Sequence, residues 1–261
     1  MSECLNGIVD FESCPIMDVS YIQQCVADLE KDGVVALKNF FSPTVVQDLV
    51  SEAEKQRAKA YFTSSTHNVY LTPNNKSFGE EHVFNRQVSS SKGCITTDQL
   101  PPNSKLHVLY RSNKFKSFIS MVVGESALFE CGDKLSGINV HYAANNQELG
   151  WHFDNSSFAI TLLLQKPLEG GAFEYVRDLR DADAGEMNFD GVKGVLDGKT
   201  KVEEVKIEPG TLVLFRGKNS IHRVTPTAGA VTRILVVLAY NNKPNVILSE
   251  AARMTFFGRL S

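Results

Sequence analysis

The stretch Gly150-Trp-His-Phe-Asp-Asn-Ser-Ser157 places His152 and Asp154 two residues apart, beside the only tryptophan of the chain, Trp151. Residues i and i+2 of an extended strand point to the same side, so this imidazole and this carboxylate can bind one metal ion together. A lone His-x-Asp pair is a weak signal, because many proteins contain one with a purely structural role. A metal site at this position therefore requires a third ligand from elsewhere in the chain.

The sequence around His222 makes it the best candidate for that ligand. It follows a turn and an apolar strand at 208–215 and a tight loop, and it begins the next predicted strand. In a jelly roll, this arrangement brings a late strand beside an earlier strand that carries the His-x-Asp pair. Two histidines and one carboxylate favour iron(II) and leave coordination positions open.

Arg233 lies eleven residues after His222 and begins the apolar stretch Ile234-Leu-Val-Val-Leu238. A guanidinium at the entrance of a buried strand needs a partner, and its planar fork suits a carboxylate held at two points. The alternative is an arginine at a strand end that points into solvent.

Helical patterns come first along the chain and strand patterns follow. Helices are predicted over 21–32, from Ser42-Pro43 to about Tyr61, and over 115–123, whereas 62–105 is polar and weakly periodic. Strands bounded by turn residues are predicted at 138–142, 158–165, 170–176, 200–207, 211–215 and 231–240. This order predicts an α+β, mainly β fold: a double-stranded β-helix (jelly roll, cupin-like) core with flanking N-terminal helices.

We expect a single domain over residues 1–261, because a chain of this length can bury one large core. Its parts are a helical lead-in at 1–134 with a lid at 62–105, the jelly-roll core at 135–245, and a C-terminal tail at 246–261. A net charge of −3 gives no sign of nucleic-acid binding, and the apolar run at 233–240 is too short to span a membrane. The five cysteines are scattered and odd in number, which favours free thiols and a cytoplasmic location. The oligomeric state stays open.

Several loose motifs together carry a family resemblance over about 138–241. They are Trp151-His-Phe-Asp154, Gly170-Gly-x-Phe-x-Tyr175, Pro209-Gly-Thr-Leu-Val-Leu-Phe215, His222-Arg-Val224 and Arg233. In order and spacing they resemble the iron(II)/2-oxoglutarate-dependent dioxygenases. The stretch from Gln147 to Thr161 is similar to the branch that contains free-amino-acid hydroxylases and halogenases.

The resemblance implies the cofactors and their ligands. Iron(II) would be bound by His152, Asp154 and His222, and 2-oxoglutarate and O₂ would be the co-substrates. The distal carboxylate of 2-oxoglutarate would pair with Arg233, and its pocket would also include Tyr142, Thr161 and Gln165. Many relatives have a serine two residues after the arginine; here that residue is Leu235, so the second hydrogen bond to the carboxylate is unassigned. Halogenases of this superfamily replace the carboxylate ligand by glycine or alanine, so Asp154 favours hydroxylation.

The expected reaction is hydroxylation of an unactivated C–H bond of a small polar metabolite, such as a free amino acid. Candidate contacts to the substrate are Arg86, Glu148, Asn155 and Trp151, each of which has a structural or surface role as its alternative. His141 is expected to be a core histidine. Alternative functions are hydroxylation of a protein or peptide side chain and, less favoured, a ligand-sensing barrel without catalysis.

Overall fold

The computed structural model describes residues 5–261, and Cys4 lies outside this range. The helices within it are α1 (Val19–Asp32), α2 (Pro43–Gln56), α3 (Lys105–Arg111), α4 (Asn113–Val123), α5 (Phe189–Leu196) and α6 (Glu250–Phe257). The strands are β1 (Val34–Leu37), β2 (Tyr61–Asn68), β3 (Gln87–Ile95), β4 (Phe129–Glu130), β5 (Ile138–Ala143), β6 (Leu149–His152), β7 (Ala159–Gln165), β8 (Glu169–Gly170), β9 (Phe173–Val176), β10 (Glu203–Val205), β11 (Leu212–Phe215), β12 (Ile221–Val224), β13 (Thr227–Ala228), β14 (Arg233–Leu238) and β15 (Tyr240–Asn241).

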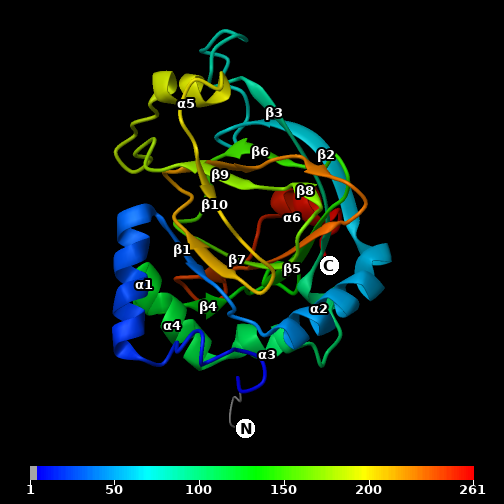
Figure 1. Cartoon of the computed structure of the whole chain (residues 1–261). Helices are drawn as coiled ribbons and strands as arrows, with labels where there is room; N and C mark the ends of the chain where they lie inside the picture. The colour runs from blue at the N-terminus through cyan, green and yellow to red at the C-terminus, as the bar shows by residue number, and fades with distance from the viewer. Residues whose placement is uncertain (1–4) are drawn as a thin grey trace.

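One antiparallel sheet dominates the molecule. Its strands follow the order β1-β11-β7-β14-β5-β3-β6-β12-β9-β10, and β2 pairs with β3 outside this path. The sheet curls until it is nearly closed, so that its two halves face each other across an interior (Figure 1). The predicted jelly-roll core with N-terminal helices is confirmed.

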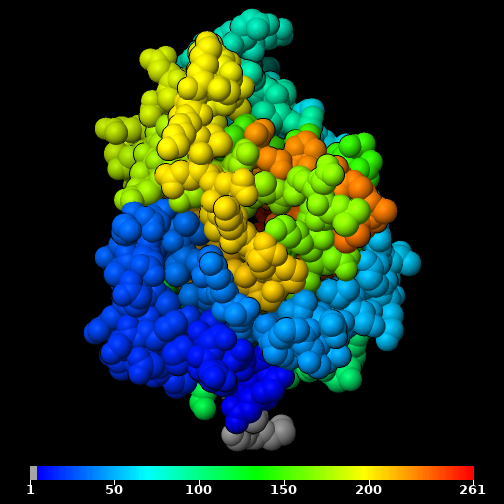
Figure 2. Space-filling view, in the orientation of Figure 1, coloured from blue at the N-terminus to red at the C-terminus, as the bar shows by residue number. Residues whose placement is uncertain are grey.

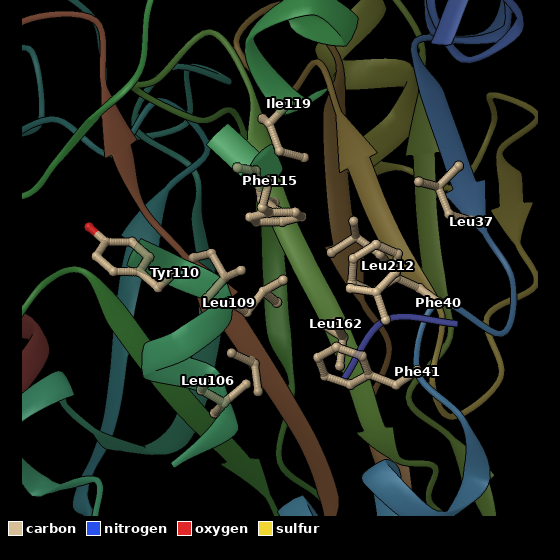
Figure 3. Close-up of a cluster of buried hydrophobic side chains, with 14 of the residues drawn as sticks. Leu37, Phe40, Phe41, Leu106, Leu109, Tyr110, Phe115, Ile119, Leu162 and Leu212 are labelled. Carbon is tan, nitrogen blue, oxygen red and sulfur yellow. The ribbon is translucent and has the colours of Figure 1, made fainter. Parts of the chain in front are cut away.

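The N-terminal helices cover the outer face of the part of the sheet that contains β7, β14 and β5 (Figure 1). Alternate strand residues, such as Leu162 and Leu212, point outward and pack against Phe40, Phe41 and Phe115 (Figure 3). The residues between them along each strand face the barrel interior, because successive side chains of a strand point to opposite faces. This alternation decides which residues can reach a ligand inside the barrel.

The helix predicted to run from Pro43 to Tyr61 is shorter than expected. It begins as predicted, with the Ser42 hydroxyl accepting a hydrogen bond from the Val45 amide, but it ends at Gln56 and a 3₁₀ turn follows. Tyr61 is the first residue of β2, which pairs with β3 along all eight of its residues. The hydrogen bonds of this long pairing take the place of a last helical turn.

The weakly periodic stretch at 62–105 contains regular secondary structure, because β2 and β3 form a hairpin and α3 begins at Lys105. The serines and threonines of the hairpin gave no apolar alternation, and periodicity therefore failed to detect its strands. The connection at 69–86 lies beside the insert that contains α5, at the top of Figure 1. Within the described residues, no helix is both long and apolar enough to cross a bilayer.

Tyr142 belongs to the helix-facing side of β5, and its hydroxyl donates a 2.7 Å hydrogen bond to the Ala53 carbonyl of α2. Tyr142→Phe removes this bond, so the buried Ala53 carbonyl loses one hydrogen-bond donor. We expect the free energy of unfolding to fall by about 1 kcal/mol in denaturant titration. The affinity for 2-oxoglutarate should stay that of the wild type in calorimetry; a large loss would contradict the outward orientation of this side chain.

Candidate metal centre

Two neighbouring strands of the sheet, β6 and β12, position the histidines. His152 ends β6 and His222 lies in β12, and the antiparallel register makes them direct cross-strand partners. Their side chains therefore point to the same side of the sheet, and their ring centroids lie 4.1 Å apart.

Hydrogen bonds to the backbone orient both rings in the same way. The Nδ1 atom of His152 lies 2.8 Å from the Gly150 carbonyl, and the Nδ1 atom of His222 lies 3.0 Å from the Ser220 carbonyl. A carbonyl can only accept, so each Nδ1 carries the proton and each Nε2 presents a lone pair. This tautomer, held by a backbone acceptor, is the one that metal-binding histidines usually adopt.

The Asp154 carboxylate completes the group. Its Oδ1 atom lies 3.6 Å from Nε2 of His152 and 3.5 Å from Nε2 of His222. Its Oδ2 atom is buried and has no hydrogen-bond partner among residues 5–261, and its backbone amide donates to the Gly217 carbonyl. A Cβ atom at Gly217 would lie only 1.9 Å from Oδ2. The close approach of the carboxylate to this part of the chain thus requires glycine at 217.

Burial and neighbouring groups shift the pKa values of two of the three ligands, His152 and Asp154. Burial, followed by the neighbouring His222, lowers the pKa of His152 to about 3, so its imidazole is neutral at pH 7. Burial by itself would raise the pKa of Asp154, but His222 and His152 hold that pKa below its usual value. A carboxylate and two imidazoles whose ligand atoms lie within 4.8 Å of one another suit a divalent metal ion. The unpartnered Oδ2 atom fits the same interpretation.

A further histidine supports the strand that carries His152. The Ser90 hydroxyl of β3 lies 2.7 Å from Nε2 of His67 and accepts a hydrogen bond from the Gly150 amide at 3.0 Å. The His67 ring lies edge-on to His152 at 6.4 Å. The hairpin of β2 and β3 is thus tied to the metal strand, a link that sequence analysis missed because Ser90 and His67 stand in a polar stretch without a motif.

Arg233 is 7% exposed and begins the strand that pairs with both β5 and β7. Within residues 5–261, no protein group accepts a hydrogen bond from its guanidinium and none forms an ion pair with it; burial lowers its pKa to about 10. With Leu163 and Phe173 it lines a cavity of about 220 Å³. Figure 2 shows this face of the molecule hollowed at its centre. Arg233 is therefore a buried cation available to an anionic ligand.

The other residues predicted to contact the co-substrate are not all directed toward the barrel interior. Thr161 is half-buried on the same face of β7 as Leu163, which lines the cavity. The Gln165 amide already donates to the Thr232 carbonyl at 2.8 Å. Tyr142 points outward to α2, since it follows the inward-facing His141 and successive strand residues alternate. We therefore leave Tyr142 out of the co-substrate pocket.

The structure separates two of the four predicted substrate contacts from the metal ligands. Arg86 pairs with Asp197 and donates to the Leu196 carbonyl, both of which belong to the α5 insert. Trp151 packs on the side opposite His152, under the guanidinium of Arg223 at 4.7 Å. Asn155 is exposed in the loop after the metal strand, and Glu148 is half-buried before it. Of the four, only Glu148 and Asn155 remain candidates.

Comparison with known proteins adds family evidence to this geometry. Residues 17–255 match the sequence profile of a family described as Halogenase D. A 2OG-Fe(II) oxygenase family protein from Burkholderia pseudomallei is similar in structure, with a TM-score of 0.53, 12% identity, and 86% of this chain and 92% of that chain covered. No curated protein sequence matches the chain.

The epimerase SnoN of nogalamycin biosynthesis is also similar, with a TM-score of 0.59 and 14% identity over 85% of this chain and 84% of that chain. Another structure of SnoN contains Fe³⁺, α-ketoglutarate and nogalamycin RO. A prolyl-4-hydroxylase from Pseudomonas putida has a TM-score of 0.50 at 14% identity and covers 83% of this chain and 96% of that one. These likenesses establish the fold of the 2-oxoglutarate/iron(II) oxygenases.

The fold and the His-Asp-His site thus define an enzyme of the 2-oxoglutarate/iron(II) oxygenase class, as the sequence motifs predicted. Within that class, the match over 17–255 shows that the chain belongs to the Halogenase D family.

The contact of Gly217 with Asp154 gives a direct test of the metal centre. In Gly217→Ala, the new methyl group overlaps Oδ2 and must displace the carboxylate from the two imidazoles. We expect the affinity for iron(II), measured by anaerobic titration, to fall by roughly tenfold or more. Gly79→Ala is the matched control, because a Cβ there meets nothing within 4 Å. Equal metal affinity in the two variants would contradict the placement of Asp154.

Proposed function

We propose that this protein is an iron(II)- and 2-oxoglutarate-dependent oxygenase that hydroxylates an unactivated C–H bond of a small polar metabolite. A free amino acid or an amino-acid-like compound is the substrate class that we favour. The proposal also places the protein in the cytoplasm, because the described cysteines, Cys14, Cys25, Cys94 and Cys131, are free.

The observation that carries the proposal is the Asp154 carboxylate between His152 and His222, one oxygen of which has no hydrogen-bond partner in the described part of the chain. Three protein ligands on one side of a metal leave the other side for a co-substrate and oxygen. Bound iron(II) would supply the activation of O₂ that couples oxidative decarboxylation of 2-oxoglutarate to hydroxylation of the substrate.

The protein's own groups bind and orient the reactants. Arg233, unpaired and buried beside a cavity of about 220 Å³, is suited to the distal carboxylate of 2-oxoglutarate. The backbone hydrogen bonds at both Nδ1 atoms keep the two imidazoles in their ligand tautomer. The packed aromatic side chains of Phe173 and Phe215, whose ring centroids lie 5.6 Å and 4.7 Å from that of His222, limit the access of water to the metal.

Asp154 also supports hydroxylation over halogenation, although the family is described by a halogenase. A halide needs a coordination position of its own, which a glycine or alanine at 154 would leave open. Here the carboxylate takes that position, and its buried place against Gly217 is formed by the chain itself.

The polar interior face of the β2–β3 hairpin supports a small polar substrate over a protein side chain. Thr63, Ser65 and His67 of β2 alternate along this face, opposite Lys92, Ser90 and Val88 of β3. Such a wall offers hydrogen bonds to a hydrophilic molecule.

Succinate formation tests the proposed reaction. With iron(II), 2-oxoglutarate and O₂, we expect one or more amino acids of a broad panel to stimulate succinate release and to gain one oxygen atom by mass spectrometry. Asp154→Gly should lower hydroxylation by on the order of 100-fold, because a metal ligand is lost. Ser156→Gly, an exposed change in the same loop, is the control. Full hydroxylation by Asp154→Gly would exclude the triad, and stimulation by peptides alone would exclude the amino-acid class.

A further inference from the structure

Lys92 of β3 is a second cation inside the barrel. Its ammonium nitrogen lies 3.3 Å from Nδ1 of His141. Burial is the largest influence on both groups and lowers both pKa values, that of His141 well below its usual value. A neutral His141 can accept a hydrogen bond from Lys92 and thereby fixes the direction of its side chain.

The contact with His141 leaves most of the hydrogen-bonding capacity of Lys92 unused. An ammonium group has three N–H donors, and His141 accepts from one of them. Among residues 5–261, no carboxylate lies within ion-pair distance of Lys92, and no other side chain or carbonyl accepts from it. Lys92 is half-buried, and its free donors face the barrel interior, where an anionic ligand can accept from them.

The strand register brings Lys92 and Arg233 to the same level of the sheet. Arg233 of β14 lies opposite Ala143 of β5, and Gly93 of β3 lies opposite Tyr142, so Lys92 comes level with Ala143 on its other side. Two strand spacings separate the two backbones, about 10 Å. Both long side chains lie on the face of the sheet that carries Ala143, whose side chain is only a methyl group.

Resting on the proposed function, we propose that Lys92 is the second cation of the 2-oxoglutarate site. Together with Arg233, it brackets the distal carboxylate of the co-substrate above Ala143.

The next inward-facing residue of β14, Leu235, explains why the distal carboxylate needs a second hydrogen-bond donor. Leu235 follows Arg233 on the same face and has no polar atom in its side chain. The two oxygens of a carboxylate accept about four hydrogen bonds, of which a guanidinium fork makes two. The free donors of Lys92 can reach an acceptor that Leu235 cannot serve. The charges of Asp154 and Arg233 also shift the pKa of Lys92, the first upward and the second downward. Such interactions are expected of a group that lies between the metal ligands and the distal carboxylate.

The test compares two 2-oxo acids that differ at the distal end. Anaerobic calorimetry on iron(II)-loaded protein gives dissociation constants for 2-oxoglutarate and for 2-oxovalerate, which has the same carbon chain but no distal carboxylate. Lys92→Met should weaken 2-oxoglutarate roughly tenfold to hundredfold, the effect of losing one charged hydrogen bond, and leave 2-oxovalerate unchanged. Lys92→Arg should restore part of the difference.

Lys105→Met is the matched control, because Lys105 pairs with Asp48 on the surface of the helical layer. It should leave both constants unchanged. Thermal melting checks that each variant is folded, and Lys92→Gln provides a second neutral variant should Lys92→Met melt early. Equal losses for the two oxo acids, or no loss for either, would overturn the assignment of Lys92 while the proposed function stands. If the wild type bound neither oxo acid in the presence of metal, the proposed function would fail, and the role of Lys92 with it.

Discussion

The cross-strand pairing of His152 with His222 is the interaction on which the rest of the site depends. It brings together two residues that are seventy positions apart, and it does so through the register of β6 and β12 rather than through any loop. Because the side-chain period of a strand is two, a slip of one residue would turn one imidazole to the outer face. The backbone acceptors at Gly150 and Ser220 then select the tautomer, and the approach of Gly217 fixes Asp154 beside both rings.

Two cations, Arg233 and Lys92, face the barrel interior that also contains the Asp154 carboxylate. Arg233 is buried and Lys92 is half-buried, and neither has an acidic partner within the described chain, so an anionic ligand would stabilise both. A dicarboxylate with one end on a metal and the other between two cations is such a ligand. The same arrangement explains why the small Ala143 lies between the two cations in the sheet.

Sequence patterns predicted the parts of this site that are local or that carry an order along the chain. The spacing of His152 and Asp154, the strand before His222 and the charge that begins β14 all follow from short-range rules, and the structure brings these residues to one interior. Tyr142 is not part of the pocket, because its neighbour His141 faces inward and strand alternation then turns Tyr142 outward toward α2. Arg86, Ser90 and Lys92 lie in a polar stretch without hydrophobic periodicity. There the pairing of β2 with β3 decides which side chains enter the barrel, and hydrophobic periodicity cannot predict that pairing.

The most direct test of the central claim is an anaerobic calorimetric titration of the metal-free wild type, first with iron(II) and then with 2-oxoglutarate. The site predicts one iron(II) per chain, and one 2-oxoglutarate that binds tightly only after the metal is present. His222→Ala should lose the tight metal step and, with it, the tight binding of 2-oxoglutarate. Binding of 2-oxoglutarate with the same affinity in the presence and absence of metal, or an unchanged metal step in His222→Ala, would contradict the account.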